Sequence, residues 1–278
     1  MPAAREDIAE IIDLAREAGK IIMSYREKGF SVSTKTDALD LVTEADHASN
    51  AFLSNELSKR FPDDALLSEE TPERPDDYSG RVWMVDPLDG TRHFIDGNEG
   101  FAVMIGLLSD GKPELGVVYD PVRDMTYFAA RGEGAFSQNA EERPEQIRVT
   151  DRTEIEGMSL VERASKGEDR PVDQFVETLG IRKMVRSGSM GIKITRVAEG
   201  EADAVFCSNP KAMKWDYCAP HVILEEAGGR ITDFDGNPVD YLVPDEEFQA
   251  LLLASNGVLH DELLRRHNAF FDASKSDL

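Results

Sequence analysis

The sequence predicts an antiparallel α+β half, residues 1–140, followed by an α/β half, residues 141–278. Three observations support this fold class. The chain opens with apolar residues at helical spacing, continues through apolar runs separated by turn residues, and then alternates strand and helix patterns. No repeat or low-complexity linker separates the two halves, so we expect them to pack closely.

In the first half, apolar residues three and four positions apart predict an amphipathic helix that ends near Gly29. A second helix is expected over residues 43–60, because Pro62 stops the pattern. Strands are then expected at 65–70, 81–86, 101–108, 114–120 and 126–130. The Asp110–Gly111 pair between the third and fourth strands favours a hairpin turn.

In the second half, strands and helices take turns along the chain. We expect strands at 158–162, 182–187, 202–206, 230–234 and 250–255. Helices are expected at 172–179, 192–199, 215–227 and 258–266. This alternation is typical of an α/β arrangement.

The charge of the chain limits its partners. Fifty-four acidic residues against 31 basic ones give a net charge of −23, which argues against nucleic acid and anionic membranes as partners. Such acidity would keep the chain dissolved, and adaptation to a salty cytosol is one hypothesis for it. The absence of a long apolar run predicts a cytoplasmic protein. Cys207 and Cys218 are expected to be free buried thiols.

The stretch MVDPLDGTRHF, residues 84–94, is the strongest candidate for a site. Pro87 imposes an extended kink after a buried strand, so the carboxylates of Asp86 and Asp89 and the carbonyl of Leu88 can converge. Carboxylates so close need a counter-ion, and magnesium prefers oxygen ligands of this kind. Gly90 and Thr91 would then begin a helical turn that can seat a phosphate. The alternative is that both acids are ordinary turn residues.

Two other segments add acids that could reach the same site. Glu69 and Glu70 end the expected strand beside this stretch, and Asp216 stands near the start of a helix, where an acid is also a routine cap. Four ordered segments resemble the inositol monophosphatase superfamily of metal-dependent, lithium-sensitive phosphatases. They are DLVTEAD at 40–46, LLSEE at 66–70, DPLDGTRHF at 86–94 and KWDYCAPHVILEEAGGRITDFDG at 214–236.

The resemblance implies a layered αβαβα sandwich that binds two or three Mg²⁺ ions. It assigns a first ion to Glu69, Asp86 and the Leu88 carbonyl, a second to Asp86, Asp89 and Asp216, and a weaker third to a place near Glu69. It gives phosphate binding to Gly90 and Thr91, and water activation to Thr91 with Asp46 or Glu69 behind it. A small phosphorylated substrate is implied, and homodimers are common in the superfamily.

The segment KWDYCAPHVILEEAGG is most similar to the 3'(2'),5'-bisphosphate nucleotidases, which implies adenosine 3',5'-bisphosphate as the substrate. Gly188, Ser189 and Lys193 match the segment that contacts the nucleotide in that branch, and a lysine suits a second phosphate. Asn209 stands where inositol phosphatases place an acid. Inositol 1-phosphate and histidinol phosphate remain alternative substrates, and an interaction protein without catalysis is the non-enzyme alternative.

Overall fold

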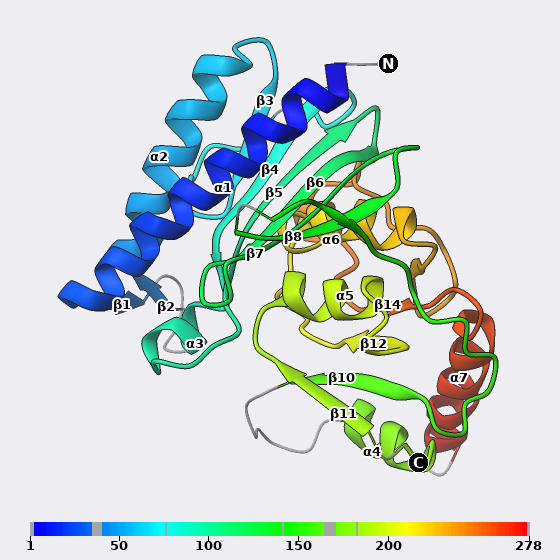
Figure 1. The fold of residues 1–278 in the computed structure, drawn as a ribbon. Helices are drawn as coiled ribbons and strands as arrows, with labels where there is room; N and C mark the ends of the chain where they lie inside the picture. The colour runs from blue at the N-terminus through cyan, green and yellow to red at the C-terminus, as the bar shows by residue number, and fades with distance from the viewer. Residues whose placement is uncertain are drawn as a thin grey trace.

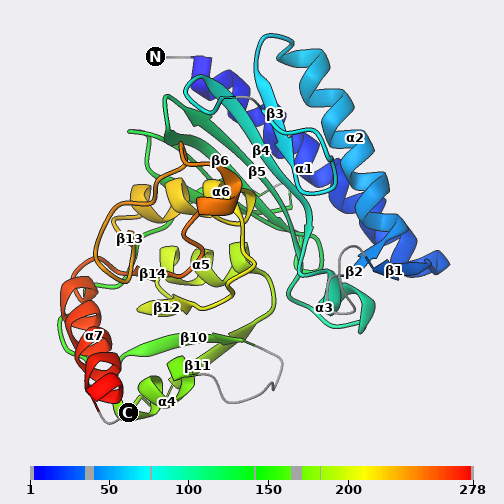
Figure 2. The ribbon, with the colours of Figure 1, turned by 180° about the vertical axis from the view of Figure 1, so that it is seen from behind.

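The computed structural model has five layers, in the order α, β, α, β, α (Figure 1). It describes residues 3–34, 41–75, 77–140, 142–163, 171–181 and 183–276. Helices α1 (Ala3–Lys28) and α2 (Glu44–Arg60) cover the outer face of a seven-stranded sheet. Helices α5 (Met190–Ala198) and α6 (Lys214–Glu226) lie between the two sheets (Figure 2). Helices α4 (Pro171–Thr178) and α7 (His260–Ser276) cover the outer face of a five-stranded sheet. The sandwich expected from the resemblance is therefore confirmed.

The seven-stranded sheet follows the chain order. Its strands are β3 (Ala65–Ser68), β4 (Arg81–Asp89), β5 (Ala102–Ser109), β6 (Lys112–Asp120), β7 (Met125–Ala130), β8 (Ala135–Asn139) and β9 (Glu145–Gln146). Only the β3–β4 pair in this sheet is parallel, and its other pairs are antiparallel. A separate hairpin, β1 (Val32–Thr34) with β2 (Leu41–Thr43), precedes α2.

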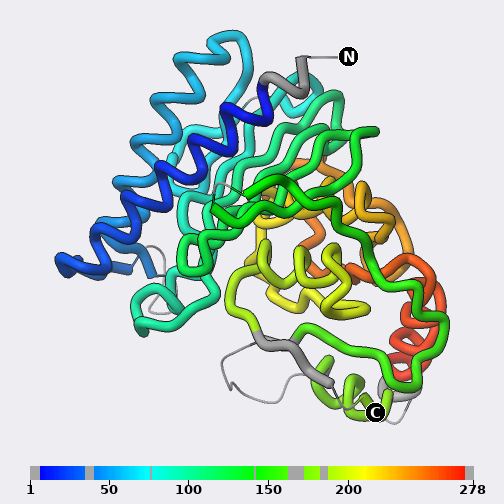
Figure 3. The backbone as a smooth tube through the Cα atoms, in the orientation of Figure 1, coloured from blue at the N-terminus to red at the C-terminus, as the bar shows by residue number. Residues whose placement is uncertain are grey.

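The five-stranded sheet is mixed. Its order is β11 (Lys183–Ser187), β10 (Ser159–Arg163), β12 (Ala204–Cys207), β14 (Leu252–Ser255) and β13 (Arg230–Asp233). Strand β10 pairs parallel with β11 and β12, whereas β14 pairs antiparallel with β12 and β13. Residues 147–158 run along one side of the molecule to connect the two sheets (Figure 3).

Both faces of β4 are buried, which explains its continuous apolar sequence. Trp83 and Val85 join the core under α1 and α2, while Val82 and Met84 join the core between the sheets. That central core takes residues from both halves of the chain. Close packing of the halves is thus observed, while a domain boundary at residue 140 stays a prediction.

Helix α6 approaches the seven-stranded sheet closely because two glycines face it. Gly106 and Gly116 are partners across β5 and β6. A Cβ atom on Gly106 would lie 2.8 Å from the Ala219 nitrogen, and one on Gly116 would lie 2.2 Å from the Ala219 oxygen. The missing side chains therefore set the height of α6 above the sheet, and with it the height of Asp216.

Most expected elements are present, and four differences stand out. Strand β4 continues to Asp89 instead of ending at Asp86, and its pairing with β5 shifts between these two residues. Helix α7 extends to Ser276, well beyond the expected residue 266. The β1–β2 hairpin and the strands β8 and β9 were not predicted, because these segments are too short or too polar to show a strand pattern. The sheet of the second half, whose strand directions were not predicted, is mixed, because β14 runs antiparallel to β12 and β13.

None of the helices in the described part of the chain combines the length and the apolar character that crossing a bilayer requires.

Candidate active site

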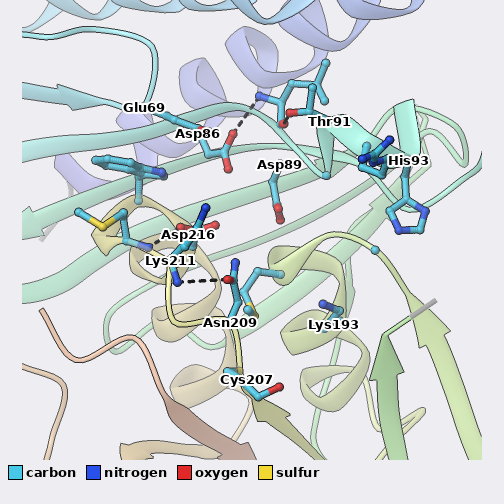
Figure 4. A pocket seen from close by; sticks show the side chains of 18 of the residues that line it. Glu69, Asp86, Asp89, Thr91, His93, Lys193, Cys207, Asn209, Lys211 and Asp216 are labelled. Carbon is cyan, nitrogen blue, oxygen red and sulfur yellow. Dashed lines mark hydrogen bonds between the residues drawn. The ribbon is translucent and has the colours of Figure 1, made fainter. Parts of the chain in front are cut away.

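A cleft with a volume of about 840 Å³ opens where β4 ends and where α5 and α6 begin (Figure 4). Several separate segments line it: Leu41 in β2, Glu69 and Arg74 after β3, 86 and 88–93 at and after the end of β4, Val161 in β10, 188, 190 and 193 near the start of α5, 205–211 in β12 and just after it, and 213, 215 and 216 at the start of α6. All of the predicted metal ligands line this cleft.

Three carboxylates meet at the base of the cleft. Asp86, Asp89 and Asp216 each offer an oxygen, and these oxygens lie within 4.8 Å of one another. We call these three residues the acidic cage. Asp86 is 2% exposed and Asp89 is 8% exposed, although both are acids. Deeply buried acids of like charge require a compensating cation or shared protons.

Each cage carboxylate is oriented by hydrogen bonds. The Leu88 N–H donates to Asp86 Oδ1 at 3.0 Å, and the Met213 N–H donates to Asp216 Oδ2 at 2.6 Å. Asp89 Oδ2 accepts from the Ser189 hydroxyl at 2.5 Å and from the Gly191 N–H at 2.9 Å. The cage is therefore preformed, because β4, α5 and α6 fix its members separately.

The environment of the cage raises the pKa of all three carboxyl groups. Burial is the largest cause in each case. The negative charges of Glu69, Asp89 and Asp216 raise the pKa of Asp86 further. Hydrogen bonds from Ser189 and Gly191, and the charge of Lys193, oppose the rise at Asp89. A divalent cation would remove the repulsion that raises these pKa values.

The local backbone explains why β4 can carry two ligands three residues apart. The regular pairing of β4 with β5 is interrupted between Asp86 and Asp89, around Pro87. The Ser49 hydroxyl fixes this irregular segment by donating to the Pro87 carbonyl at 2.9 Å. Gly90 then turns the chain into α3 (Thr91–Ile95) with a φ of 93°, in the left-handed region. A Cβ atom there would lie 2.8 Å from the Gly100 oxygen, so this turn requires glycine.

Thr91 and Asp46 form the predicted pair beside the cage. The Thr91 hydroxyl lies 3.0 Å from Asp46 Oδ1 and 3.2 Å from the Leu88 carbonyl oxygen, and its single proton can be donated to one of them at a time. Asp46 is held in turn by a capping box at the start of α2, where Asp46 Oδ2 accepts from the Thr43 N–H at 2.8 Å and from the Thr43 hydroxyl at 2.5 Å. Burial raises the pKa of Asp46, although the bonds from Thr43 and Thr91 oppose the rise.

Glu69 enters the cleft from the turn after β3. Its N–H donates to the Val85 carbonyl at 3.1 Å, which ties this turn to β4 one residue before Asp86. The negative charge of Glu69 and its side-chain hydrogen bond to Asp86 both raise the pKa of Asp86. The two carboxyl groups are therefore close together. The segments 69, 86–91 and 216, predicted to converge, are therefore brought together.

Comparison with known proteins agrees with this geometry. The model of the inositol monophosphatase family matches residues 4–269. The chain belongs to this family.

Members with different stated activities resemble it to similar degrees. Histidinol-phosphatase of Mycobacterium tuberculosis is 33% identical over 96% of this chain and 99% of its own length. The 3'(2'),5'-bisphosphate nucleotidase CysQ of Escherichia coli is 36% identical over 86% of this chain and 95% of its own. The IMPase structure from Thermotoga maritima superimposes with a TM-score of 0.81 at 29% identity, covering 96% and 99% of the two chains.

Membership makes the protein a phosphatase that acts on small phosphorylated substrates, in a family that depends on Mg²⁺. The donor set fits that ion, because the cage offers carboxylate oxygens and the neighbouring groups that line the cleft include Glu69 and Leu88. Neither cysteine belongs to the cage, and burial raises the pKa of the Cys207 thiol to about 12.

The residues predicted to contact substrate occupy different environments. Lys193 and Gly188 line the cleft. Gly188 packs against His93, since a Cβ atom there would lie 2.1 Å from the ring carbon Cδ2. Ser189 is fully buried, where its hydroxyl donates to Asp89 and accepts from the Ile192 N–H as the N-cap of α5. The hydroxyl of Ser189 thus orients a cage carboxylate, and its contact with substrate stays a prediction.

Sequence reasoning did not single out several residues that line the cleft, among them Arg74, Lys211 and Trp215. Lys211 lies two residues after Asn209, whose side chain accepts from the Lys211 N–H at 3.1 Å. Acidic residues outnumber basic ones by 54 to 31, so a lysine just before the KWD segment was the sequence feature that could have indicated a role for Lys211 in the cleft. Nothing in the sequence placed Arg74 near Trp215, because the two lie 141 positions apart.

Proposed function

We propose that the protein is a Mg²⁺-dependent phosphomonoesterase that removes the 3'-phosphate from adenosine 3',5'-bisphosphate. One observation carries the proposal: the acidic cage, Lys193 and Lys211 line a single cleft (Figure 4). The cage suits the phosphate that is cleaved, because ions held there neutralise it. The lysines suit a second anionic group on the same substrate.

We assign Asp86, Asp89 and Asp216, with Glu69 and the Leu88 carbonyl, as ligands for two to three Mg²⁺ ions. When bound, the ions supply positive charge to the phosphoryl group and lower the pKa of water. The carboxylates need little rearrangement to accept them, because hydrogen bonds already fix their orientation. Ser189 acts in this proposal by holding Asp89.

Thr91 and Asp46 would manage the proton of the attacking water. With its own proton directed at Asp46 Oδ1, the Thr91 oxygen keeps lone pairs that can accept a proton from water. Asp46 then receives the threonine proton, which its raised pKa favours. Glu69, close to Asp86, is the second candidate for directing this water.

The turn into α3 would hold the phosphate oxygens. Gly90 places the chain at the start of a helix, and the first N–H groups of a helix lack acceptors within it. Thr91 is the first residue of this helix, so its hydroxyl lies beside those N–H groups. An anion there is favoured by these donors and by the ions together.

The cleft favours a substrate with a second negative charge. Histidinol phosphate carries a positive amino group, which Lys193 and Lys211 would repel. Inositol 1-phosphate offers hydroxyl groups, and Asn209 stands where inositol phosphatases place an acid to bind them. Adenosine 3',5'-bisphosphate instead presents a 5'-phosphate to the lysines and a purine to Trp215. The similarity to CysQ supports the same choice.

The test is phosphate release from adenosine 3',5'-bisphosphate, inositol 1-phosphate and histidinol phosphate, each with Mg²⁺ and then with Li⁺ added. We expect the bisphosphate to have the highest kcat/KM and Li⁺ to inhibit. Adenosine 3'-monophosphate is the matched control, since it lacks only the 5'-phosphate. Lys193→Gln and Lys211→Gln should raise KM for the bisphosphate about tenfold or more, and should change KM for the monophosphate little. If the bisphosphate is the poorest substrate, the assignment is wrong.

Histidinol phosphate is the second candidate. The relative that carries this activity aligns with 96% of this chain, and the segment DPLDGTRHFI also resembles that group. The same assay decides between them, because the metal ligands are common to both proposals. A cytoplasmic location and a homodimer stay predictions.

A further inference from the structure

A second cluster of charged and aromatic side chains lies next to the cage, and only its Trp215 has a role in the function proposed above. It consists of Arg74, Tyr78, Lys214, Trp215 and Asp245, which we call the charged clasp. Lys214 is 0% exposed, an unusual position for a lysine. Its Nζ lies 3.0 Å from Asp245 Oδ1 and 3.5 Å from the centre of the Tyr78 ring, and it donates to the Val243 carbonyl at 2.5 Å. The Tyr78 hydroxyl donates to the same Asp245 oxygen at 2.9 Å.

Arg74 extends this cluster to the mouth of the cleft. Its Nε lies 3.4 Å from Asp245 Oδ2, and its guanidinium carbon lies 5.2 Å from the centre of the Trp215 ring. Its Nη1 also donates to the carbonyls of Ser68, at 3.2 Å, and Thr71. These two carbonyls flank the turn that carries Glu69. One side chain thus contacts the Glu69 turn and Trp215, the neighbour of Asp216.

We propose that the charged clasp positions Glu69 relative to Asp216, and so keeps the acidic cage in the geometry that binds divalent cations. The two acids come from opposite halves of the chain, and their negative charges repel each other. The clasp opposes that repulsion, because it joins Arg74 and Tyr78 to the start of α6 through Asp245. Its members are positioning residues: in this proposal none of them contacts an ion.

The competing explanation is that the clasp stabilises the fold and nothing more. A buried Lys–Asp pair with good hydrogen bonds is compatible with either role. The two differ in what happens to metal affinity. A fold-stabilising cluster changes the melting temperature alone, whereas a positioning cluster changes ion affinity in protein that remains folded.

The test uses Arg74→Gln, which keeps the aliphatic stem as far as Cδ and a polar end but loses the charge and the guanidinium fork. Arg74 is 36% exposed, so the variant should fold. Mn²⁺ binding is measured by EPR on the full chain without substrate. We expect the dissociation constant to rise about tenfold, the lower end of the range of about 10- to 100-fold for partners that orient ligands. Tyr78→Phe, which removes one hydrogen bond to Asp245, should raise it by less.

Arg81→Gln is the matched control. Arg81 also pairs with an aspartate, at 2.9 Å from Asp64, and it begins the strand that carries Asp86, but it lies at the end away from the cleft. We expect its Mn²⁺ affinity to stay within about twofold of wild type. The proposal is overturned if Arg74→Gln binds Mn²⁺ like wild type, or if Arg81→Gln loses as much affinity.

Asp245→Asn completes a double-variant cycle with Arg74→Gln. If Arg74 acts through Asp245, the double variant should bind Mn²⁺ no more weakly than the weaker single variant. If the loss of Mn²⁺ affinity in the double variant equals the product of the two single losses, Arg74 does not act through Asp245. The inference rests on the metal roles proposed for Glu69 and Asp216 and not on the identity of the substrate. Wild-type protein that binds no Mn²⁺ would therefore reject both proposals, while normal binding with a poor nucleotide rate would reject only the substrate assignment.

Discussion

Two sets of carboxylates in this molecule, Asp203 alone and the three residues of the acidic cage, have opposite surroundings. Asp203 is 1% exposed, and its Oδ2 accepts from Arg152 Nε at 3.0 Å and from the Ser159 N–H at 2.7 Å. Its Oδ1 accepts from the Thr150 hydroxyl. Asp86 and Asp89 of the acidic cage are also buried, but there three carboxylates lie within 4.8 Å of one another.

The difference separates a structural acid from a binding acid. Asp203 is neutralised inside the fold, by an arginine and by two other donors, as buried ionised groups generally are. The cage gathers like charges whose pKa values are raised by burial and by one another. This repulsion destabilises the folded protein unless a cation binds to the cage. The two carboxylate sets therefore predict opposite responses to substitution.

The largest expected effect is the loss of catalytic activity that Asp216→Asn causes. Loss of one ligand should remove several kcal/mol of charge stabilisation, so kcat/KM should fall about a thousandfold. The metal-free variant should melt at a higher temperature than metal-free wild type, because a repelled charge has been removed. Phosphate release and thermal melting in EDTA measure the two changes. Lower stability together with lower activity would mean that the cage is a structural cluster.

The next largest effect is a loss of folding stability caused by Asp203→Ala. Removing this partner leaves Arg152 and the Ser159 N–H without their acceptor, at a cost of about 3 kcal/mol. Urea denaturation should show the loss. Activity per folded molecule should stay near wild type, because the contacts of Asp203 lie outside the cleft. If activity falls as it does for Asp216→Asn, the distinction between the two sets fails.

Metal addition should have a smaller effect than either substitution. A ligand present at 100 times its dissociation constant stabilises the folded state by about 2.7 kcal/mol. Saturating Mg²⁺ should therefore raise the melting temperature of wild type and Asp203→Ala alike, and EDTA should reverse the rise. Asp216→Asn should show little of it. Equal shifts in all three proteins would place the binding site elsewhere.

The part of the site that the sequence could predict consists of residues close together in the chain. The kink at Pro87, the two aspartates around it and Gly90 act within five positions, so local rules describe them. The pairing of Thr91 with Asp46 followed from the family resemblance, and the structure has the hydrogen bond at 3.0 Å. The apolar strands and the two central helices were also predictable, because burial leaves a clear pattern.

What could not be predicted depends on contacts between distant segments. Arg74 meets Asp245 and Trp215 across more than 140 positions, and no local pattern encodes such a meeting. The burial of Ser189 was missed for a similar reason, since a serine before a helix is equally consistent with a cap and with a substrate contact. Strand β8 pairs with the edge that β7 offers, and β9 pairs with β8 in turn, which their own residues do not reveal.

Asp120 provides the smallest and sharpest test, because it falls between the two sets. It is 2% exposed and accepts from the N–H groups of Val122 and Arg123. Burial raises its pKa to about 6, which Arg196 opposes and Glu99 supports. Since the folded pKa exceeds the unfolded value, the group contributes its full stability only below about pH 4. That contribution is lost as the pH rises through about 6.

Asp120→Asn should therefore stabilise the protein at neutral pH by about 2 kcal/mol, because asparagine keeps the acceptor oxygen but not the charge. The difference from wild type should widen between about pH 4 and pH 6 and level off above that range. Denaturation of both proteins in EDTA across this range measures it, and titration of the cage cancels because both proteins share the cage. A constant difference would mean that Asp120 stays charged throughout, so that it belongs with Asp203 as a neutralised structural acid.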